Sequence, residues 1–373
     1  MSWPTVTLAD LCEFKYGKAL PAANRTPGSV PVYGSNGQVG NHDTSITHGP
    51  AVIVGRKGSV GEVHYSPNPC WPIDTTYFVD QTATTADLRW LAYRLQGLGL
   101  TRMNKAAAVP GLNRADAYRL SLLLPPIEEQ RRIADILDRA ETLRVKRHQA
   151  LAHLNDLTRS IFLEMFGERA YKWTTFKVVD LVDTDAGGMR TGPFGSQLLH
   201  SEFVNEGIAV LGIDNAVTNR FTWSERRYIS PQKYAQLARY TVNPGDVLIT
   251  IMGTCGRAAV VPGDVPVAIN TKHLCCISLD RTRCLPEYLH AYFLQHPAAR
   301  DYLTRTAKGA IMSGLNMGII KAMPVSIPPL EVQIEFVMRL RAAEGTGERC
   351  KAQLAGLDGL FTSLQQRAFA GTL

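Results

Sequence analysis

The chain contains one module twice, and this duplication constrains its fold more than any other feature. The motif Leu124–Gln130 (Leu-Pro-Pro-Ile-Glu-Glu-Gln) returns 203 residues later as Ile327–Gln333 (Ile-Pro-Pro-Leu-Glu-Val-Gln). A Lys-x5-Gly-Leu-Asn segment precedes each copy at the same offset, over Lys105–Asn113 and Lys308–Asn316. The 373 residues are therefore predicted to form two similar domains, each long enough to bury its own core.

Weaker matches extend the repeat toward the N-terminus of each half. Asp10-Leu11 matches Asp180-Leu181 at an offset of 170, and Val52–Val54 matches Val247–Ile249 at an offset of 195. The offset only grows along the chain, as one duplication with insertions in the second copy requires. We predict that the second copy is the larger, with its extra chain around Met189–Arg239.

Each half has the sequence pattern of a mixed α+β domain. The apolar runs Ala51–Val54 and Val247–Ile251 are bounded by Gly and Pro, which is typical of strands. Tyr33–Gly37 contains Asn-Gly, a strong hairpin-turn signal. Short helices are predicted over Asp87–Leu95 and Glu287–Leu294. Strands followed by helices in each half indicate an α+β fold.

A long helix is predicted after each Pro-Pro pair. From Glu128 to Phe166, apolar residues recur at heptad positions for about five repeats, which makes a rod of about 60 Å. The second copy keeps part of this seam but contains Gly345-Thr346-Gly347, where we expect a break because glycine costs about 1 kcal/mol in a helix. The two apolar stripes are predicted to pack on each other in a coiled coil. The alternative is that each helix folds back on its own domain.

Composition and charge narrow the class of protein. Lys plus Arg exceeds Asp plus Glu by 40 to 33, a net charge of +7 that is compatible with a polyanionic partner. No apolar run is long enough to span a membrane, and the first residues lack the pattern of a signal peptide. The seven cysteines show no CxxC pair and no matched histidine spacing, which favours free thiols in a reducing cytoplasm.

Catalytic motifs are missing from the sequence. There is no G-x-x-x-x-G-K-[ST] loop for ATP, no H-E-x-x-H and no G-x-S-x-G. A duplicated chain of this kind is more typical of a protein that reads a sequence than of an enzyme, and we expect no catalytic residue, metal site or cofactor in it.

Candidate DNA-contacting residues in the first half lie in its predicted turns. Phosphate contacts need Lys, Arg and small polar side chains, and base readout needs side chains that reach into a groove. The loop Arg56–Ser59 fits this use, and it fits a solvated hairpin tip equally well. Lys105 is a candidate phosphate clamp, as is Lys308 in the second half, whereas Asn113 and Asn316 are also typical of a helix N-cap. The candidates are Ser35, Asn36, Arg56, Lys57, Ser59, Thr75, Thr76, Lys105, Asn113 and Arg114.

The second half offers related positions with changed residues. Asp74–Tyr77 aligns with Asn270–His273 at an offset of 196, as expected if the halves read different sequences. An ordinary polar strand end would give the same pattern. The segment Arg190–Gln197 mixes base-reading side chains with flexible backbone and also fits a simple Ω-loop. The candidates are Arg190, Ser196, Gln197, Arg257, Lys272, His273, Lys308 and Asn316.

Taken together, the chain resembles the specificity subunits of type I restriction–modification systems. The resemblance rests on the motifs Leu124–Gln130 and Ile327–Gln333, the long helix after each, and the Gly-Leu-Asn segments before them. Tyr33–Gly37 and Gly245–Leu248 also resemble sequence segments that recur in the family's target recognition domains. The resemblance covers essentially the whole chain, and the paired motif at this spacing is specific.

The resemblance implies an architecture. Target recognition domains would occupy residues 1–124 and 171–326, each reading half of a bipartite, asymmetric site in double-stranded DNA. Helical spacers would occupy residues 125–170 and 327–373 and pack as an antiparallel coiled coil. The family's DNA contacts vary too much to transfer residue by residue.

The same resemblance implies partners in the cytoplasm and none in a membrane. DNA adenine methyltransferase subunits, which use S-adenosylmethionine, would dock on this scaffold, and an ATP-dependent restriction and translocase subunit that needs ATP and Mg would join them. The alternative is a specificity subunit of a methylation-only or phage-exclusion system that lacks the nuclease. Two other classes stay open, namely an enzyme that depends on Asp74 or Asp246 and a coiled-coil adaptor without a role on nucleic acid.

Overall fold

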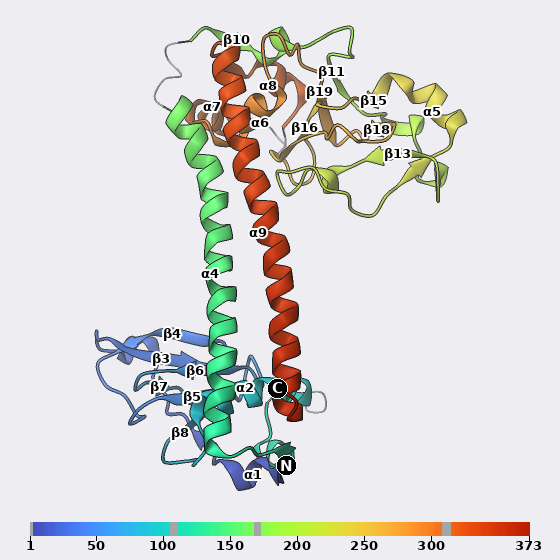
Figure 1. Ribbon diagram of the computed structural model, residues 1–373. Helices are drawn as coiled ribbons and strands as arrows, with labels where there is room; N and C mark the ends of the chain where they lie inside the picture. The colour runs from blue at the N-terminus through green and yellow to red at the C-terminus, as the bar shows by residue number, and fades with distance from the viewer. Residues whose placement is uncertain (1–2, 105–110, 168–172, 308–314) are drawn as a thin grey trace. The chain divides into compact units, whose positions relative to one another are not determined.

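The computed structural model describes residues 3–104, 111–167, 173–307 and 315–373, and it divides into two compact units. The first unit comprises Met1–Ala150 and Cys350–Leu373, and the second comprises Leu151–Arg349. Two long helices, α4 (Ile127–Phe166) and α9 (Leu330–Ala370), each contribute residues to both units (Figure 1). The bounds of α4 agree with the helix predicted from Glu128 to Phe166.

The core of the first unit is a four-stranded antiparallel sheet covered by a helix. Its order is β2 (Lys15–Tyr16), β8 (Thr76–Asp80), β5 (Ala51–Gly55), β6 (Val63–Ser66). Strand β5 is buried on both faces, which explains its continuous apolar run. Helix α2 (Leu88–Gly97) supplies Trp90, Leu91 and Leu95 to this core.

Smaller elements complete the first unit. Strands β4 (Gly37–His42), β3 (Val30–Gly34) and β7 (Trp71–Pro72) form a second sheet, and β1 (Thr5–Thr7) pairs with β9 (Ser121–Leu123). Two short helices, α1 (Leu8–Leu11) and α3 (Arg114–Tyr118), accompany them. The predicted hairpin is confirmed, since Ser35 and Asn36 connect β3 to β4, and Gly37, with φ +111°, begins β4 opposite Gly34.

The second unit repeats this plan. Its four-stranded sheet has the order β11 (Met189–Thr191), β19 (Leu274–Ile277), β16 (Val247–Thr250), β17 (Ala258–Val260), again entirely antiparallel. Strand β10 (Thr175–Lys177) pairs with β20 (Pro324–Ser326) as β1 pairs with β9. The helices are α6 (Pro286–Gln295), α7 (Pro297–Ala307) and α8 (Met317–Ala322). The duplication predicted from sequence is therefore a duplication of the fold.

The second unit also carries the predicted additional chain. Its other sheet has five strands in the order β12 (Phe203–Val204), β14 (Tyr228–Ile229), β13 (Ile208–Leu211), β18 (Ala268–Asn270), β15 (Thr241–Val242), where the first unit has three. Helix α5 (Pro231–Leu237) lies in the same stretch of chain. These additions overlap the segment that the growing offset indicated.

Strand register corrects one alignment between the halves. Gly55 of β5 pairs with Thr76, and the equivalent Thr250 of β16 pairs with Leu274. Thr76 therefore corresponds to Leu274, so the predicted equivalence of Asp74–Tyr77 with Asn270–His273 is wrong by two residues. The loop between β17 and β18 is longer than its counterpart between β6 and β7, and this difference caused the error, because sequence similarity there is too weak to fix the register.

The two long helices are antiparallel where they meet in each unit. In the first unit, Arg144 of α4 forms a 2.7 Å ion pair with Asp358 near the end of α9. In the second unit, Phe162 near the end of α4 lies 5.7 Å from Phe336 near the start of α9, centroid to centroid. Both ends of α4 also enter the domain cores, with Ile133 in the first core and Phe166 in the second. The ends of α9 do the same, with Ala368 in the first core and Phe336 in the second. The two long helices therefore pack on each other, and each also packs on the domains, so the two predicted alternatives occur together.

The expected break at Gly345-Thr346-Gly347 is absent, because α9 is one continuous helix across these residues. A Cβ added at Gly347 would meet nothing within 4 Å, so the glycine does not serve close packing. Burial of Ala343 and Cys350 on either side supplies free energy that offsets the low helix propensity.

The glutamine that ends each repeated motif joins the long helix to its domain. Gln130 accepts a 2.9 Å hydrogen bond from the N–H of Asp87, the N-cap of α2, and donates to the Pro125 carbonyl oxygen at 2.9 Å. Gln333 likewise accepts from the N–H of Leu285, the N-cap of α6, at 2.8 Å and donates to Pro328. Both side chains are buried, so each amide fixes the start of one helix against the start of another.

We predict that Gln130→Met and Gln333→Met each lower the free energy of unfolding by about 1–3 kcal/mol, because buried backbone groups lose their partner. Urea denaturation followed by circular dichroism measures the change. Gln149→Met, at an exposed position of α4, is the control and is expected to stay within about 0.5 kcal/mol of the parent. Equal stability of all three variants would contradict this role for the motif.

Candidate nucleic-acid interface

Three turns of the first unit come together beside the four-stranded sheet. The N–H groups of Arg56 and Lys57, in the β5–β6 turn, donate to the carbonyl oxygen of Thr75 at 2.9 and 3.0 Å. The N–H of Ser59 donates to Ser35 Oγ at 3.4 Å, which brings in the β3–β4 turn. The N–H of Leu112 donates to the Arg56 carbonyl oxygen at 2.9 Å. The structure thus brings together most of the residues predicted from the first half.

Two arginines of this region stack on one exposed tyrosine. The guanidinium carbons of Arg56 and Arg114 lie 5.4 and 5.3 Å from the ring centroid of Tyr16, whose side chain is 55% exposed. Arg56 Nη2 donates to the Asp74 carbonyl oxygen at 2.6 Å, and Arg114 Nη1 donates to that of Phe14 at 3.2 Å. These bonds hold both cations in place through backbone oxygens and an aromatic face.

Neither guanidinium has an ion-paired carboxylate among the residues that the structure describes. Two fixed positive charges without a counter-ion form a favourable position for an anion such as a DNA phosphate. Burial raises the pKa of the neighbouring Tyr77, while Arg56 and Arg114 oppose the rise, so this phenol stays neutral. We call Tyr16, Arg56 and Arg114 the arginine–tyrosine cluster.

Several candidates of the first half have structural contacts of their own. Thr76 is buried, and its hydroxyl donates to the Ile73 carbonyl oxygen at 2.7 Å. Asn113 caps α3 by accepting from the N–H of Ala115, and Asn316 caps α8 by accepting from that of Ile319, both at 2.9 Å. The N-cap interpretation of both asparagines is therefore confirmed. Lys57 and Asn36 are exposed at the turns. Lys105 and Lys308 lie outside the described residues.

The equivalent region of the second unit is also cationic. Lys272 and His273 precede β19, and Arg257 is exposed at the end of the β16–β17 turn. Partial burial and the positive charges of Lys272 and Arg227 lower the pKa of His273, so this imidazole is neutral at pH 7. Ser196 and Gln197 lie on a 3-10 turn (Gly195–Gln197), where Gln197 accepts from the Tyr240 hydroxyl at 2.9 Å.

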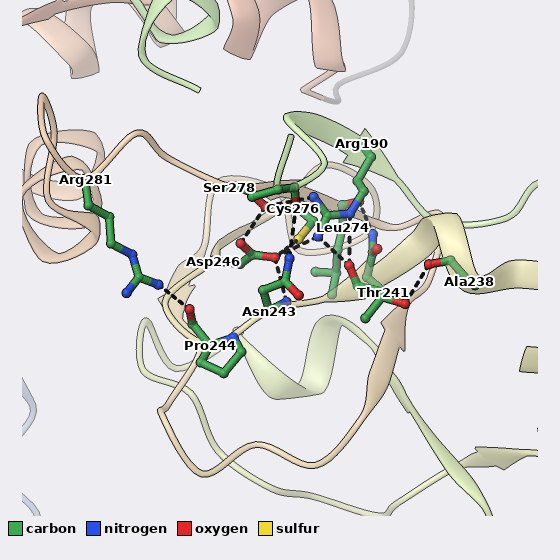
Figure 2. A network of polar contacts seen from close by, with 12 residues as sticks. Arg190, Ala238, Thr241, Asn243, Pro244, Asp246, Leu274, Cys276, Ser278 and Arg281 are labelled. Carbon is green, nitrogen blue, oxygen red and sulfur yellow. Dashed lines mark hydrogen bonds and ion pairs between the residues drawn. The ribbon is translucent and has the colours of Figure 1, made fainter. Parts of the chain in front are cut away.

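Arg190 occupies a buried polar network, which removes it from the candidate DNA contacts (Figure 2). Its Nη2 lies 2.7 Å from Asp246 Oδ2, its Nη1 donates to Ser278 Oγ at 2.9 Å, and it also donates to the Thr241 carbonyl oxygen. The exposed fraction of Arg190 is 9%. Side chains alternate between the two faces of the short strand β11, and Arg190 is on the buried face. The polar residues and glycines of this segment gave no sign of that orientation in the sequence.

The same network accounts for Asp246. Its two carboxylate oxygens contact Arg190, Ser278 and Cys276, so both are engaged in hydrogen bonds or an ion pair. Burial and the nearby Asp246 carboxylate raise the pKa of the Cys276 thiol well above its ordinary value. The arrangement is that of a structural ion pair. In the first unit Lys15, which has the strand position of Arg190, pairs with Asp80 at 3.1 Å.

Sequence reasoning missed Tyr16 and the two motif glutamines. Tyr16 lies in a two-residue strand with no distinguishing pattern, and only the fold places it between the arginines. The glutamines did carry a signal, since both copies of the motif end in the same residue. In the part of the chain that the structure describes, no group of three His, Cys, Asp or Glu side chains could hold a metal ion, and no helix is apolar and long enough to cross a membrane.

Two tandem copies of one α+β fold, each followed by a long helix of an antiparallel pair, define the class of this protein. A model of the type I restriction modification DNA specificity domain matches residues 1–153 and 172–349. The chain belongs to this family, and the resemblance and fold class predicted from the sequence are confirmed.

Individual relatives agree with this assignment. The EcoBI specificity subunit of Escherichia coli is 27% identical over 174 residues, which span 46% of this chain and 36% of that subunit. A Haemophilus influenzae protein, provisionally assigned as a type I restriction enzyme specificity subunit, is 24% identical over 86% of this chain and 81% of its own length. The crystal structure of a type I S subunit from M. genitalium covers 99% of this chain and 96% of its own, with a TM-score of 0.65 and 14% identity.

We predict that Arg114→Ala weakens binding of the assembled complex to any duplex, and that the slope of log K against log salt concentration becomes shallower by about one. A phosphate contact has this effect because it releases a counter-ion whatever the base sequence. Fluorescence anisotropy at several salt concentrations measures both quantities. Arg131→Ala is the control, because Arg131 lies on α4 and pairs with Glu128. A loss confined to one sequence would contradict a phosphate contact.

Proposed function

We propose that this chain is the DNA specificity subunit of a type I restriction–modification complex and that it has no catalytic activity of its own. One observation carries the proposal, namely two domains of the same fold that differ in the residues of equivalent turns. Each turn region is cationic, as contacts with phosphate require. Two domains that recognise different sequences, joined in one chain, suit a bipartite, asymmetric site in double-stranded DNA.

The chain divides between recognition and spacing. We assign residues 1–124 and 171–326 to the two target recognition domains, and residues 125–170 and 327–373 to the helical spacers. The buried motif glutamines support this division, because they lie where each helix meets its domain. Because an α-helix rises by a fixed distance per residue, the length of these helices can set the number of unrecognised base pairs between two half-sites.

The proposed partners supply the chemistry. DNA adenine methyltransferase subunits would bring S-adenosylmethionine, and an ATP-dependent restriction and translocase subunit would bring ATP and Mg. We place this complex in the cytoplasm, where the seven cysteines stay free thiols. A methylation-only or phage-exclusion complex is the second candidate, but no feature of this chain favours it.

Sequencing that maps modified adenines tests the function directly. In cells that carry this chain and its methyltransferase subunit, we expect one asymmetric bipartite motif with a fixed spacer. Cells with the methyltransferase subunit alone are the control and are expected to lack the motif. The same motif in both cell lines, or none in either, would contradict the proposal.

We predict that removal of one heptad from each helix changes the spacer and leaves both half-sites unchanged. Residues 145–151 of α4 and 349–355 of α9 are suitable, since Cys350 Sγ lies 3.8 Å from the Arg147 carbonyl oxygen. Seven residues shorten a helix by about 10 Å, close to three base pairs of DNA. The same adenine mapping gives the new motif, and an altered half-site with the parental spacer would argue against a ruler.

A further inference from the structure

The β5–β6 turn and the β16–β17 turn are equivalent residue by residue. At the start of each turn, the N–H of Arg56 donates to Thr75 and that of Ile251 donates to His273, both at 2.9 Å. At the end, Gly61 donates to Gly55 at 2.8 Å and Gly256 donates to Thr250 at 3.0 Å. Position 57 of the first unit therefore corresponds to position 252 of the second.

The neighbour of each turn is equivalent as well. Gly58 and Gly253 both have positive φ, at +79° and +69°. A Cβ at Gly58 would lie 3.1 Å from Ser35 Oγ, and one at Gly253 would lie 3.0 Å from Ile213 Cδ1. Ser35 and Ile213 thus occupy the same place beside the turn. Ser35 follows Gly34, the last residue of β3, and Ile213 follows Gly212, which comes directly after β13.

The chemistry of the two turns is opposite. The first unit presents Arg56 and Lys57 beside Ser35, so its turn is cationic and polar. The second presents Ile251 and Met252 beside Ile213, so the equivalent part of its turn is apolar. Ile251 is buried, but Met252 is 41% exposed at the tip of the turn. A flexible thioether side chain on an apolar base is suited to contact with another apolar group.

A positive charge nevertheless remains next to the apolar turn. Because Thr75 corresponds to His273, Asp74 of the first unit corresponds to Lys272 of the second. Lys272, just before β19, thus replaces an acid, and Arg257 is exposed at the end of the same turn. The second unit therefore keeps positive charge for phosphate around a turn in which position 252 is apolar.

We propose that positions 57 and 252 are specificity-determining, and that Met252 reads the C5-methyl group of a thymine in its half-site. In the major groove only an A·T pair presents a methyl group, and apolar side chains are the contacts that recognise it. Lys57, at the same position of the first unit, donates hydrogen bonds and selects the acceptors of guanine instead. This inference rests on the proposed function and names the chemistry of that same surface.

Replacing thymine by uracil tests the inference, because uracil lacks only the methyl group. The probe is a set of duplexes that carry the mapped site with each thymine replaced in turn, bound by this chain assembled with its methyltransferase subunits. We expect one replacement, in one half-site, to weaken binding about four-fold, which corresponds to the burial of one methyl group. Met252→Ala is expected to bind thymine and uracil duplexes equally, by loss of affinity for thymine alone.

Two further variants complete the test. Met338→Ala removes an exposed methionine of α9 and is expected to keep the parental preference for thymine. Lys57→Met is expected to create a preference for thymine in the other half-site. If Met252→Ala keeps the parental thymine-to-uracil ratio at every position, the inference is wrong while specific binding still supports the proposed function. If the parental complex binds all sequences equally, the proposed function itself fails.

Discussion

The rest of the structure depends on one buried amide in each half. Gln130 and Gln333 each bridge the first turn of a long helix to the first turn of a domain helix, and neither is accessible to water. An amide in this place satisfies backbone groups that would otherwise be buried without a partner, so its loss costs more than a typical surface hydrogen bond. Each domain is thereby fixed to the helix that follows it. The glutamine and the two prolines before it are the same residues in both copies.

Away from the glutamine that joins each domain to its helix, the two copies differ by an amount that depends on the place in the fold. Both units have an ion pair at the first strand of the four-stranded sheet, but the base changes from Lys15 to Arg190, and the acid changes from Asp80 at the end of β8 to Asp246 just before β16. The second sheet grows from three strands to five. At the turns beside the main sheet the chemistry reverses, from Lys57 to Met252. Change is therefore smallest where packing decides the residue and largest where solvent, or a bound molecule, meets it.

The long helices show how tertiary contacts outweigh local preference. α9 contains glycines that an isolated helix of this length would not tolerate without fraying, yet it is continuous. Its first turns supply Phe336 to the core of the second unit, and its last turns supply Ala368 to that of the first. A helix held by burial near both ends and by α4 between them can carry glycines in its partly exposed middle. Helix propensity alone predicted a break there, and that prediction was wrong.

The sequence by itself determined the duplication, the α+β class, the two long helices and the larger second half, because repeats and apolar periodicity are properties of the order of residues. It also indicated the turns where the candidate contacts gather. Only the tertiary structure decided which of those residues face solvent. Arg190 and Thr76 point inward, Asn113 and Asn316 cap helices, and Tyr16 becomes the platform for two arginines. Strand register, which a weakly similar loop cannot specify, is the physical reason, since a shift of two residues was enough to hide that Lys272 replaces Asp74 beside the turn that carries Met252.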